Sequence, residues 1–230
     1  MRSDEEPILK DQIGYYRARA GEYDQWFLRE GRYDRGPEHR AEWLAEVEVI
    51  RRALTGAIHN SDVLELACGT GLWTEQLARE NHHVYAVDAS PETIAINRNR
   101  LRADNVDYEV ADIFSWAPTR QFDAVFFAFW LSHVPANRFE RFWEAVRKAV
   151  TNGRVFFVDS LLEQTSTARD HPAVDGSGVV RRRLDDGREF DIVKVFYEPA
   201  QLEERLVALG WRGTVRSTGK FFLFGFFRNS

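Results

Sequence analysis

Residues 62–71, D-V-L-E-L-A-C-G-T-G, constrain the fold of this chain more than any other stretch. Their first half is a short apolar run that ends at a glycine turn, which is typical of a buried parallel strand. Gly69 and Gly71 follow at once, and residues 72–80 have the spacing of an amphipathic helix. Glycines admit a ligand close to the backbone, and a helix N-terminus offers free N–H groups. The order therefore predicts a ligand cradle at the carboxyl edge of an open α/β sheet.

An acid inside the apolar run adds a second feature to the cradle. Glu65 stands four residues before Gly69, and its carboxylate needs donors from the loop or from a cationic ligand, since a buried charge without partners is costly. A dinucleotide-binding Gly-x-Gly-x-x-Gly would need a glycine where Thr74 stands. The string E-L-A-C-G-T-G resembles motif I of the class I S-adenosylmethionine-dependent methyltransferases, E/D-x-G-x-G-x-G, with Ala67 at the first glycine. A plain strand–helix turn that binds nothing is the alternative.

Two further acids follow in the order that this family has. Asp88 ends the predicted strand 83–88, where a carboxylate can accept hydrogen bonds from two vicinal ribose hydroxyls. Ser90 is the better N-cap for the next helix, which leaves Asp88 free for a ligand. A nicotinamide cofactor would also predict Asp88. The tripeptide Ala111-Asp112-Ile113 resembles the family's next contact, in which the acid accepts from the adenine amino group and Ile113 covers the ring.

Residues 1–60 are predicted to form a helical lid over this cofactor. Residues 13–28 are predicted to be helical and residues 38–54 form a clear amphipathic helix. The pattern Y-Y-x-x-x-A-x-x-Y-D, at residues 15–24, is similar to the lid of ubiquinone- and sugar-methylating relatives, whose tyrosines reach the methionine end of the cofactor. The alternative is that these aromatics only pack the helix onto the sheet. The resemblance implies S-adenosylmethionine as the cofactor, with contacts from Tyr16, Tyr23, Glu65, Ala67, Cys68, Gly69, Gly71, Trp73, Asp88, Ala89, Asp112, Ile113 and Phe129.

The segment after the central strand 122–130 is expected to face the reacting methyl group. His133 is the obvious base there for an oxygen or nitrogen nucleophile, and its loss would then matter less as pH rises. The alternative is that His133 only holds the loop. Trp26, Phe27 and Trp130 indicate a small, partly apolar methyl acceptor, and the nucleophile can be oxygen, nitrogen, sulfur or carbon.

The C-terminal third is less regular. Residues 161–178 are predicted to be a loop, and 179–184 with 188–197 a β-hairpin. Residues 199–209 are predicted to be a helix before a strand pair at 211–217 and 221–227. Within the hairpin, Arg181-Arg182-Arg183 could bind an anionic substrate or could form a solvated strand edge.

The sequence thus predicts one α/β methyltransferase domain with a Rossmann-like seven-stranded, mostly parallel sheet and an antiparallel C-terminal strand. Its parts are a lid (1–60), a cofactor-binding core (61–160), an insertion with a hairpin (161–198), and a C-terminal helix with a strand pair (199–230). The net charge of −5 argues against nucleic acid and anionic membranes, and one cysteine excludes an internal disulfide. We expect a cytoplasmic enzyme with a small-molecule substrate and no metal. A nicotinamide-dependent oxidoreductase and a non-catalytic S-adenosylmethionine-binding protein are the rival functions, and the sequence does not indicate the oligomeric state.

Overall fold

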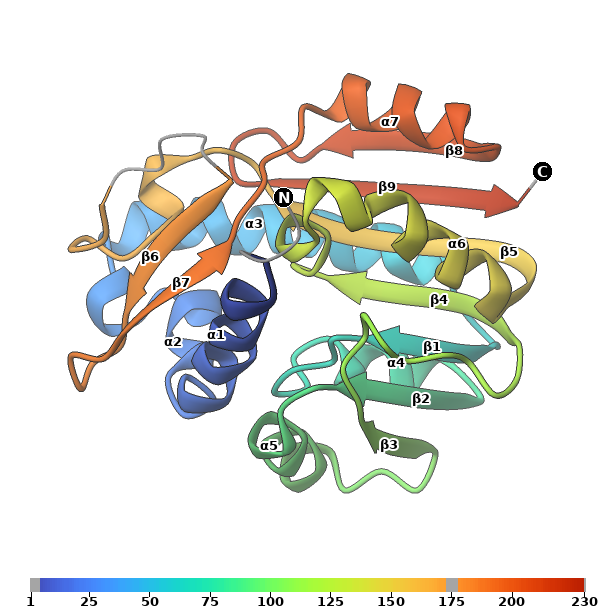
Figure 1. Ribbon diagram of the computed structural model, residues 1–230, viewed down its shortest axis with the longest axis horizontal. Helices are drawn as coiled ribbons and strands as arrows, with labels where there is room; N and C mark the ends of the chain where they lie inside the picture. Colours follow the sequence, from blue (N-terminus) through green and yellow to red (C-terminus); the bar gives the residue numbers. More distant parts are fainter. Residues whose placement is uncertain (1–4, 173–177, 230) are drawn as a thin grey trace.

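A computed structural model describes residues 5–172 and 178–229 of the chain. A seven-stranded sheet forms its centre, with strand order β3-β2-β1-β4-β5-β9-β8 (Figure 1). The first five strands in chain order are parallel, and β9 pairs antiparallel with both β5 and β8. The strands are β1 (Asp62–Leu66), β2 (His83–Asp88), β3 (Val106–Val110), β4 (Phe122–Ala128), β5 (Val150–Ser160), β8 (Trp211–Ser217) and β9 (Phe222–Asn229). The predicted sheet is therefore confirmed.

Helices cover both faces of this sheet, as its apolar strands require. One core lies under α3 and α4 and holds Trp43 and Phe126, while the opposite core lies under α6 and α7 and holds Phe127 and Trp143. The alternation of Phe126 and Phe127 to opposite faces follows from the period of two along β4. These helices and α5 are α3 (Pro37–Ala57), α4 (Thr74–Glu80), α5 (Pro91–Leu101), α6 (Phe139–Ala149) and α7 (Pro199–Ala208).

The predicted lid, residues 1–60, divides in the structure: its third helix, α3, packs on a face of the sheet, and two short helices lie where the sequence indicated one helical stretch over residues 13–28. These two helices are called the lid from here on. These are α1 (Glu5–Ala18) and α2 (Tyr23–Leu28), joined by a turn that contains Gly21. Glycine lowers helix stability, and here the break redirects the chain across the end of the sheet. Short 3₁₀ turns occur at η1 (Gly31–Tyr33), η2 (Leu131–His133), η3 (Ala136–Arg138) and η4 (Gln164–Ser166).

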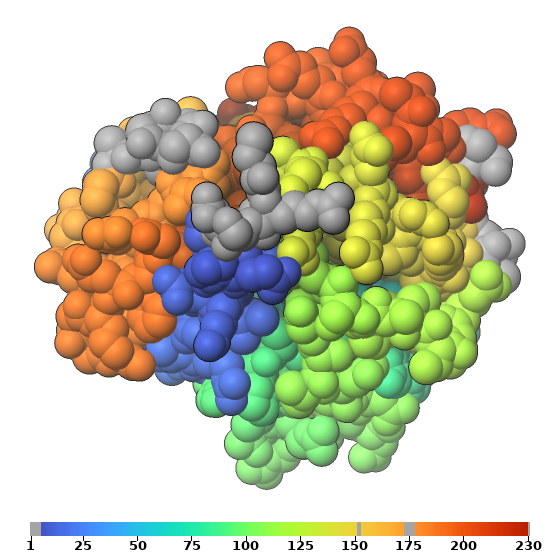
Figure 2. Space-filling view, in the orientation of Figure 1, coloured from blue at the N-terminus to red at the C-terminus, as the bar shows by residue number. Residues whose placement is uncertain are grey.

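The predicted hairpin forms a separate two-stranded sheet of β6 (Val179–Arg183) and β7 (Glu189–Val193). Both the hairpin and the lid lie at the end of the main sheet where the parallel strands terminate (Figure 1). Figure 2 shows α1, in dark blue, between the orange hairpin and the green part of the core. Residues far apart in sequence, from the lid, the hairpin and the strand ends, are thereby brought to one edge.

Candidate active site

The loop after β1 has the backbone that the glycine pattern predicted. Ala67, Gly69 and Gly71 all have positive φ, at 55°, 53° and 92°. A Cβ on Gly69 would meet no atom within 4 Å, so this glycine borders open space. A Cβ on Gly71 would lie 2.5 Å from Asn97 Oδ1, so this glycine instead lets the loop pack against α5. Gly69 is therefore the position that admits a ligand close to the backbone.

Asp88 lies at the end of β2 and organises the loop from beside it. Its Oδ2 accepts a hydrogen bond from the Gly69 N–H at 2.9 Å, and its Oδ1 accepts from the Ser90 N–H at 2.9 Å. Burial raises the pKa of this carboxyl, and the two backbone donors partly offset that effect. The Ser90 side chain caps α5 as predicted, by accepting from the Thr93 N–H at 3.1 Å.

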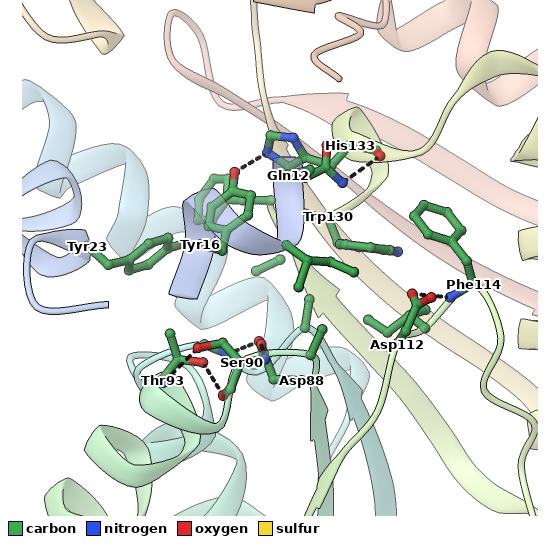
Figure 3. A pocket seen from close by; sticks show the side chains of 17 residues that line it. Gln12, Tyr16, Tyr23, Asp88, Ser90, Thr93, Asp112, Phe114, Trp130 and His133 are labelled. Carbon is green, nitrogen blue, oxygen red and sulfur yellow. Dashed lines mark hydrogen bonds between the residues drawn. The ribbon is translucent and has the colours of Figure 1, made fainter. Parts of the chain in front are cut away.

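A pocket opens beside this loop (Figure 3). Asp88 and Asp112 line it from the strand ends, while Tyr16 and Tyr23 line it from the lid. The Asp112 carboxylate accepts from the Phe114 N–H at 3.0 Å. The predicted site residues that this pocket brings together are Tyr16, Tyr23, Ala67, Gly69, Asp88, Ala89, Asp112, Ile113, Phe129, Trp130 and His133.

Glu65 lies in an adjoining cavity together with Cys68, Gly69 and Trp73. Its side chain is buried, and its Oε2 has no hydrogen-bond partner among the described residues. Burial raises the pKa of this carboxyl to about 8. A buried acceptor without a partner, next to an open glycine loop, fits a ligand that carries a cationic group.

A hydrogen bond between Tyr16 and His133 joins the lid to the core at the edge of the first pocket. The Tyr16 hydroxyl and His133 Nε2 are 2.7 Å apart, and His133 Nδ1 lies 2.6 Å from the Val193 carbonyl oxygen. Since a carbonyl only accepts, Nδ1 carries the proton and Nε2 accepts from the Tyr16 hydroxyl. Burial, together with nearby Lys194, holds the pKa of His133 well below its ordinary value. The imidazole is therefore neutral and both of its nitrogens are engaged.

A second cavity shares Tyr16, Tyr23, Phe129 and His133 with the first pocket. Three cationic side chains from separate segments also line it: Arg19 from the turn after α1, Arg182 from β6, and Lys194 from just after β7.

Two of these cations are buried, and the third, Lys194, has 11% of its side chain exposed. Arg19 and Arg182 are each 8% exposed. Lys194 Nζ donates to Ser132 Oγ at 2.8 Å and lies 3.6 Å from Asp159 Oδ1. Among the described residues, no carboxylate comes within ion-pair distance of Arg19 or Arg182.

The three residues predicted to contact the methyl acceptor occupy different surroundings. Trp26 lines the second cavity and donates its indole N–H to the Ser166 carbonyl at 2.9 Å. Phe27 is buried in the core and lines the cavity of Glu65. Trp130 lines the first pocket, with its ring 5.2 Å from that of Phe114.

The three arginines of the hairpin do not share one environment: one lies at the site, as an anion-binding role would require, and two lie on the solvated strand edge. Arg182 is buried at the second cavity, whereas Arg181 is exposed and pairs with Asp191 at 2.9 Å. Arg183 is also exposed and pairs with Asp170 at 2.6 Å. Only the middle arginine faces the site.

Sequence reasoning missed several lining residues. Gln12 lines the first pocket, and Arg19 and Lys194 line the second. Lys194 did carry a signal, since it is a lone cation within the apolar run I-V-K-V-F. Arg19 stands among other charges, and nothing in its neighbourhood distinguishes it.

Comparison with known proteins agrees with this geometry. Residues 63–153 match the family model of a methyltransferase domain. The ubiquinone biosynthesis O-methyltransferase of Xanthomonas campestris pv. campestris (strain B100) is 29% identical over 171 residues, covering 73% of this chain and 69% of that protein. The enzyme of the same name from Xylella fastidiosa (strain 9a5c) is 40% identical over 78 residues, which span 31% of its length.

Two solved structures are similar over nearly the whole chain. The DhpI–SAH complex is 44% identical, covers 98% of both chains and has a TM-score of 0.78. The DhpI–SAM–HEP complex is 45% identical, covers 96% of this chain and 98% of the other, and has a TM-score of 0.79. The strand order, the glycine loop after β1 and these matches place the chain in one family: it belongs to the class I S-adenosylmethionine-dependent methyltransferases, and S-adenosylmethionine is its cofactor.

Proposed function

We propose that this enzyme transfers the methyl group of S-adenosylmethionine to an ionised oxygen of a small anionic acceptor. The observation that carries the proposal is the cluster of Arg19, Arg182 and Lys194 around the second cavity, beside the cofactor pocket. Buried charges are costly unless an opposite charge accompanies them. Within the described part of the chain only Asp159 supplies one, next to Lys194. An anionic acceptor would supply the missing negative charge.

The surroundings of His133 support an acceptor that is already ionised. A neutral alcohol or amine must lose a proton during methyl transfer, and a base near neutrality would assist it. His133 does not act as a general base in this arrangement, because its pKa is held well below its ordinary value and its Nε2 accepts a hydrogen bond from the Tyr16 hydroxyl. Burial also holds the pKa of Tyr16 well above its ordinary value. An ionised oxygen needs no base, so we assign His133 to positioning.

The cofactor supplies a methyl group on a sulfonium centre that becomes neutral as the group leaves. Asp88 and Asp112 would hold the adenosine, and Glu65 would lie toward the cationic end. Tyr16, Tyr23 and Phe129 line both cavities, so they would flank the reacting atoms and keep water away from them.

The relatives support parts of this proposal. Those named ubiquinone biosynthesis O-methyltransferase methylate oxygen. DhpI has been solved with SAM and HEP together, which supports a ternary arrangement in this fold. We also propose that the enzyme works in the cytoplasm on a free small molecule. The net charge of −5 supports this by disfavouring nucleic acid and anionic lipid as partners. No helix in residues 5–172 and 178–229 is long and apolar enough to cross a bilayer.

Methyl-labelled S-adenosylmethionine with a panel of acceptors tests the proposal. The panel should pair small carboxylates and phosphate monoesters with neutral phenols and alcohols of similar size. We expect label transfer to the anions, and a loss of roughly 100-fold or more in kcat/KM for Arg182→Gln. Arg181→Gln, which removes the neighbouring exposed arginine, should leave kcat/KM unchanged. Transfer to neutral acceptors that Arg182→Gln leaves intact would refute the anionic acceptor. Cofactor binding without transfer to any acceptor, in the panel or in a metabolite extract, would favour a non-catalytic protein.

A further inference from the structure

The second cavity lies between the lid and the hairpin, which also meet through hydrogen bonds from the Val193 N–H to Gln12 Oε1 and from the Asp185 N–H to the Glu22 carboxylate. Arg19 belongs to the lid, whereas Arg182 and Lys194 belong to the hairpin and the residue after it. The only hydrogen bond that Arg19 makes to another side chain among the described residues is from Nη2 to the Tyr33 hydroxyl, at 3.2 Å. Arg182 Nη1 lies 3.4 Å from His171 Nδ1. Among the residues that the structure describes, neither Arg19 nor Arg182 forms an ion pair with a carboxylate.

The three cations repel one another across the cavity. Burial is the largest cause that lowers the pKa of Arg182, and Arg19 lowers it further. The pKa of Lys194 is likewise lowered by burial and by both arginines, although Asp159 opposes this effect. The rings of Tyr15, Tyr23 and Tyr33, with centroids 5.5, 5.1 and 5.8 Å from Arg19 Cζ, favour the charge on Arg19. They do not remove its repulsion of Arg182 and Lys194, which without an anion opposes the approach of the lid to the hairpin.

The same lid covers the cofactor pocket. Tyr16 and Tyr23 lie on both sides of Arg19 in the sequence, and both line that pocket (Figure 3). On the opposite side two polar contacts join the lid to the core beside the cofactor pocket. Arg17 pairs with Glu92 at 3.2 Å, and Asp24 accepts from the Thr70 hydroxyl at 2.6 Å.

We propose that the acceptor anion fastens the lid by bridging Arg19 to Arg182 and Lys194, so that acceptor and cofactor bind with positive cooperativity. This inference rests on the anionic acceptor proposed above. An anion in the cavity attracts Arg19 on one side and Arg182 and Lys194 on the other, which offsets the repulsion between these cations. A fastened lid holds Tyr16 and Tyr23 over the cofactor, whose exchange then requires the lid to open. Because coupling between two sites is reciprocal, each ligand must raise the affinity of the other by the same factor.

Two binding measurements test the coupling with inorganic phosphate as the anion and S-adenosylhomocysteine as the cofactor product. The first is the dissociation rate of S-adenosylhomocysteine, followed by intrinsic tryptophan fluorescence with and without phosphate at constant ionic strength. The second is the affinity of each ligand in the presence of the other, by calorimetry. We expect phosphate to slow dissociation and to raise the affinity by about fivefold or more, and S-adenosylhomocysteine to raise phosphate affinity by the same factor.

Arg19→Gln identifies the lid as the coupled element. This variant should still bind phosphate through Arg182 and Lys194, more weakly, and the effect of phosphate on S-adenosylhomocysteine should disappear. Arg181→Gln is the matched control, because it removes an exposed arginine that is paired with Asp191, and it should keep the coupling. Hydrogen exchange of residues 5–18 adds a direct readout. Phosphate should slow it in the protein with bound S-adenosylhomocysteine, and not in Arg19→Gln.

The outcomes separate this inference from the proposed function. Phosphate that binds with an Arg182 dependence but leaves S-adenosylhomocysteine dissociation unchanged would refute the coupling and leave the anionic acceptor standing. Equal coupling in the wild type and in Arg19→Gln would also refute it, since the lid would then play no part. No phosphate binding and no methyl transfer to anions would refute the anionic acceptor itself, and the coupling with it.

Discussion

The loop that forms the cradle depends on positive φ angles, which residues other than glycine rarely adopt. Gly69 has a φ of 53° and borders open space, while its N–H donates to Asp88. Ala67 has a φ of 55°, which is uncommon for a residue with a Cβ. It stands where the motif of the family has its first glycine, so the loop keeps a left-handed conformation without one there.

Replacing Gly69 with valine should abolish cofactor binding in a protein that still folds. The β-branched side chain would fill the space beside the loop and would disfavour its positive φ. Calorimetry should show a loss in S-adenosylhomocysteine affinity of roughly 100-fold or more, as expected for a cost near 3 kcal/mol. Gly187→Val, in the hairpin turn, is the control, because Gly187 also has a positive φ and open space around it. Unchanged affinity in Gly69→Val would mean that the cradle is elsewhere.

Glu65 should make the stability of the cofactor-free protein depend on pH. Burial raises its pKa from the ordinary 4.5 to about 8 in the folded state. Between these values the unfolded chain loses the proton while the folded chain keeps it, so this contribution to stability is lost as pH rises toward 8. Glu65→Gln, which mimics the neutral acid, should therefore gain stability over the wild type as pH rises from 5 to 8.5. The gain is at most about 1.4 kcal/mol per pH unit.

Thermal unfolding across that pH range measures the effect. Glu140→Gln, at an exposed position of α6, is the control and should follow the wild type at every pH. A constant difference between Glu65→Gln and the wild type from pH 5 to 8.5 would contradict a raised pKa at Glu65.

His133→Ala should slow methyl transfer by a similar factor at every pH between 6 and 9. A positioning residue contributes through contacts that do not titrate in this range, and here those contacts are to Tyr16 and to the Val193 carbonyl. A general base would give a different profile, with a loss that shrinks as pH rises and the acceptor ionises unaided. The pH profile of kcat/KM for the variant and the wild type decides between the two roles. A shrinking loss would restore His133 as the base.

Polar contacts join the lid to the hairpin and to the strand ends. Gln12 of α1 donates from Nε2 to the His133 carbonyl at 3.2 Å and accepts at Oε1 from the Val193 N–H at 3.1 Å. One buried amide thus joins α1 to η2 and to the end of β7. Around it Tyr15 packs against Phe190, with ring centroids 5.7 Å apart.

Gln12→Leu should loosen the lid, because it leaves two buried backbone groups without partners. Each such group costs about 1–3 kcal/mol, although water can reach them if α1 separates from the hairpin. We therefore expect faster hydrogen exchange over residues 5–18 and several-fold weaker S-adenosylhomocysteine binding. Gln201→Leu, at an exposed position of α7, should change neither quantity. Unaltered exchange in Gln12→Leu would show that the aromatic packing alone holds α1.

The elements show why some of this site could be predicted from the sequence and some could not. The cradle and Asp88 lie within 27 residues of each other and follow a local pattern of strand, glycine turn and helix. Arg19, Arg182 and Lys194 come together only because the hairpin packs on α1. An alternating strand pattern does not tell which face is buried, so the sequence left Arg182 undecided between a solvated edge and an anion site.

The seven-stranded sheet has its first pocket at its carboxyl edge, where ligands are expected to bind in an open sheet with a topological switch point. The strand order reverses between β1 and β4, and the first pocket opens there with residues from both strand ends. The lid and the hairpin cover this edge. Any ligand that fits the pocket therefore contacts several elements at once and should stabilise the folded state as a whole.

S-adenosylhomocysteine should raise the thermal unfolding midpoint of the whole protein, and NAD should not. A ligand that binds only the folded state at 100 times its dissociation constant adds about 2.7 kcal/mol of stability, which corresponds to roughly 5–10 °C for a chain of this size. A nicotinamide cofactor would need a glycine at the position of Thr74 in its phosphate loop, and Thr74 is instead a buried residue of α4. Gly69→Val is the control for site-specific binding, and its midpoint should not respond to S-adenosylhomocysteine. A rise with NAD that Gly69→Val abolishes would show that the cradle binds a dinucleotide. A rise with S-adenosylhomocysteine that persists in Gly69→Val would place the cofactor outside the loop after β1.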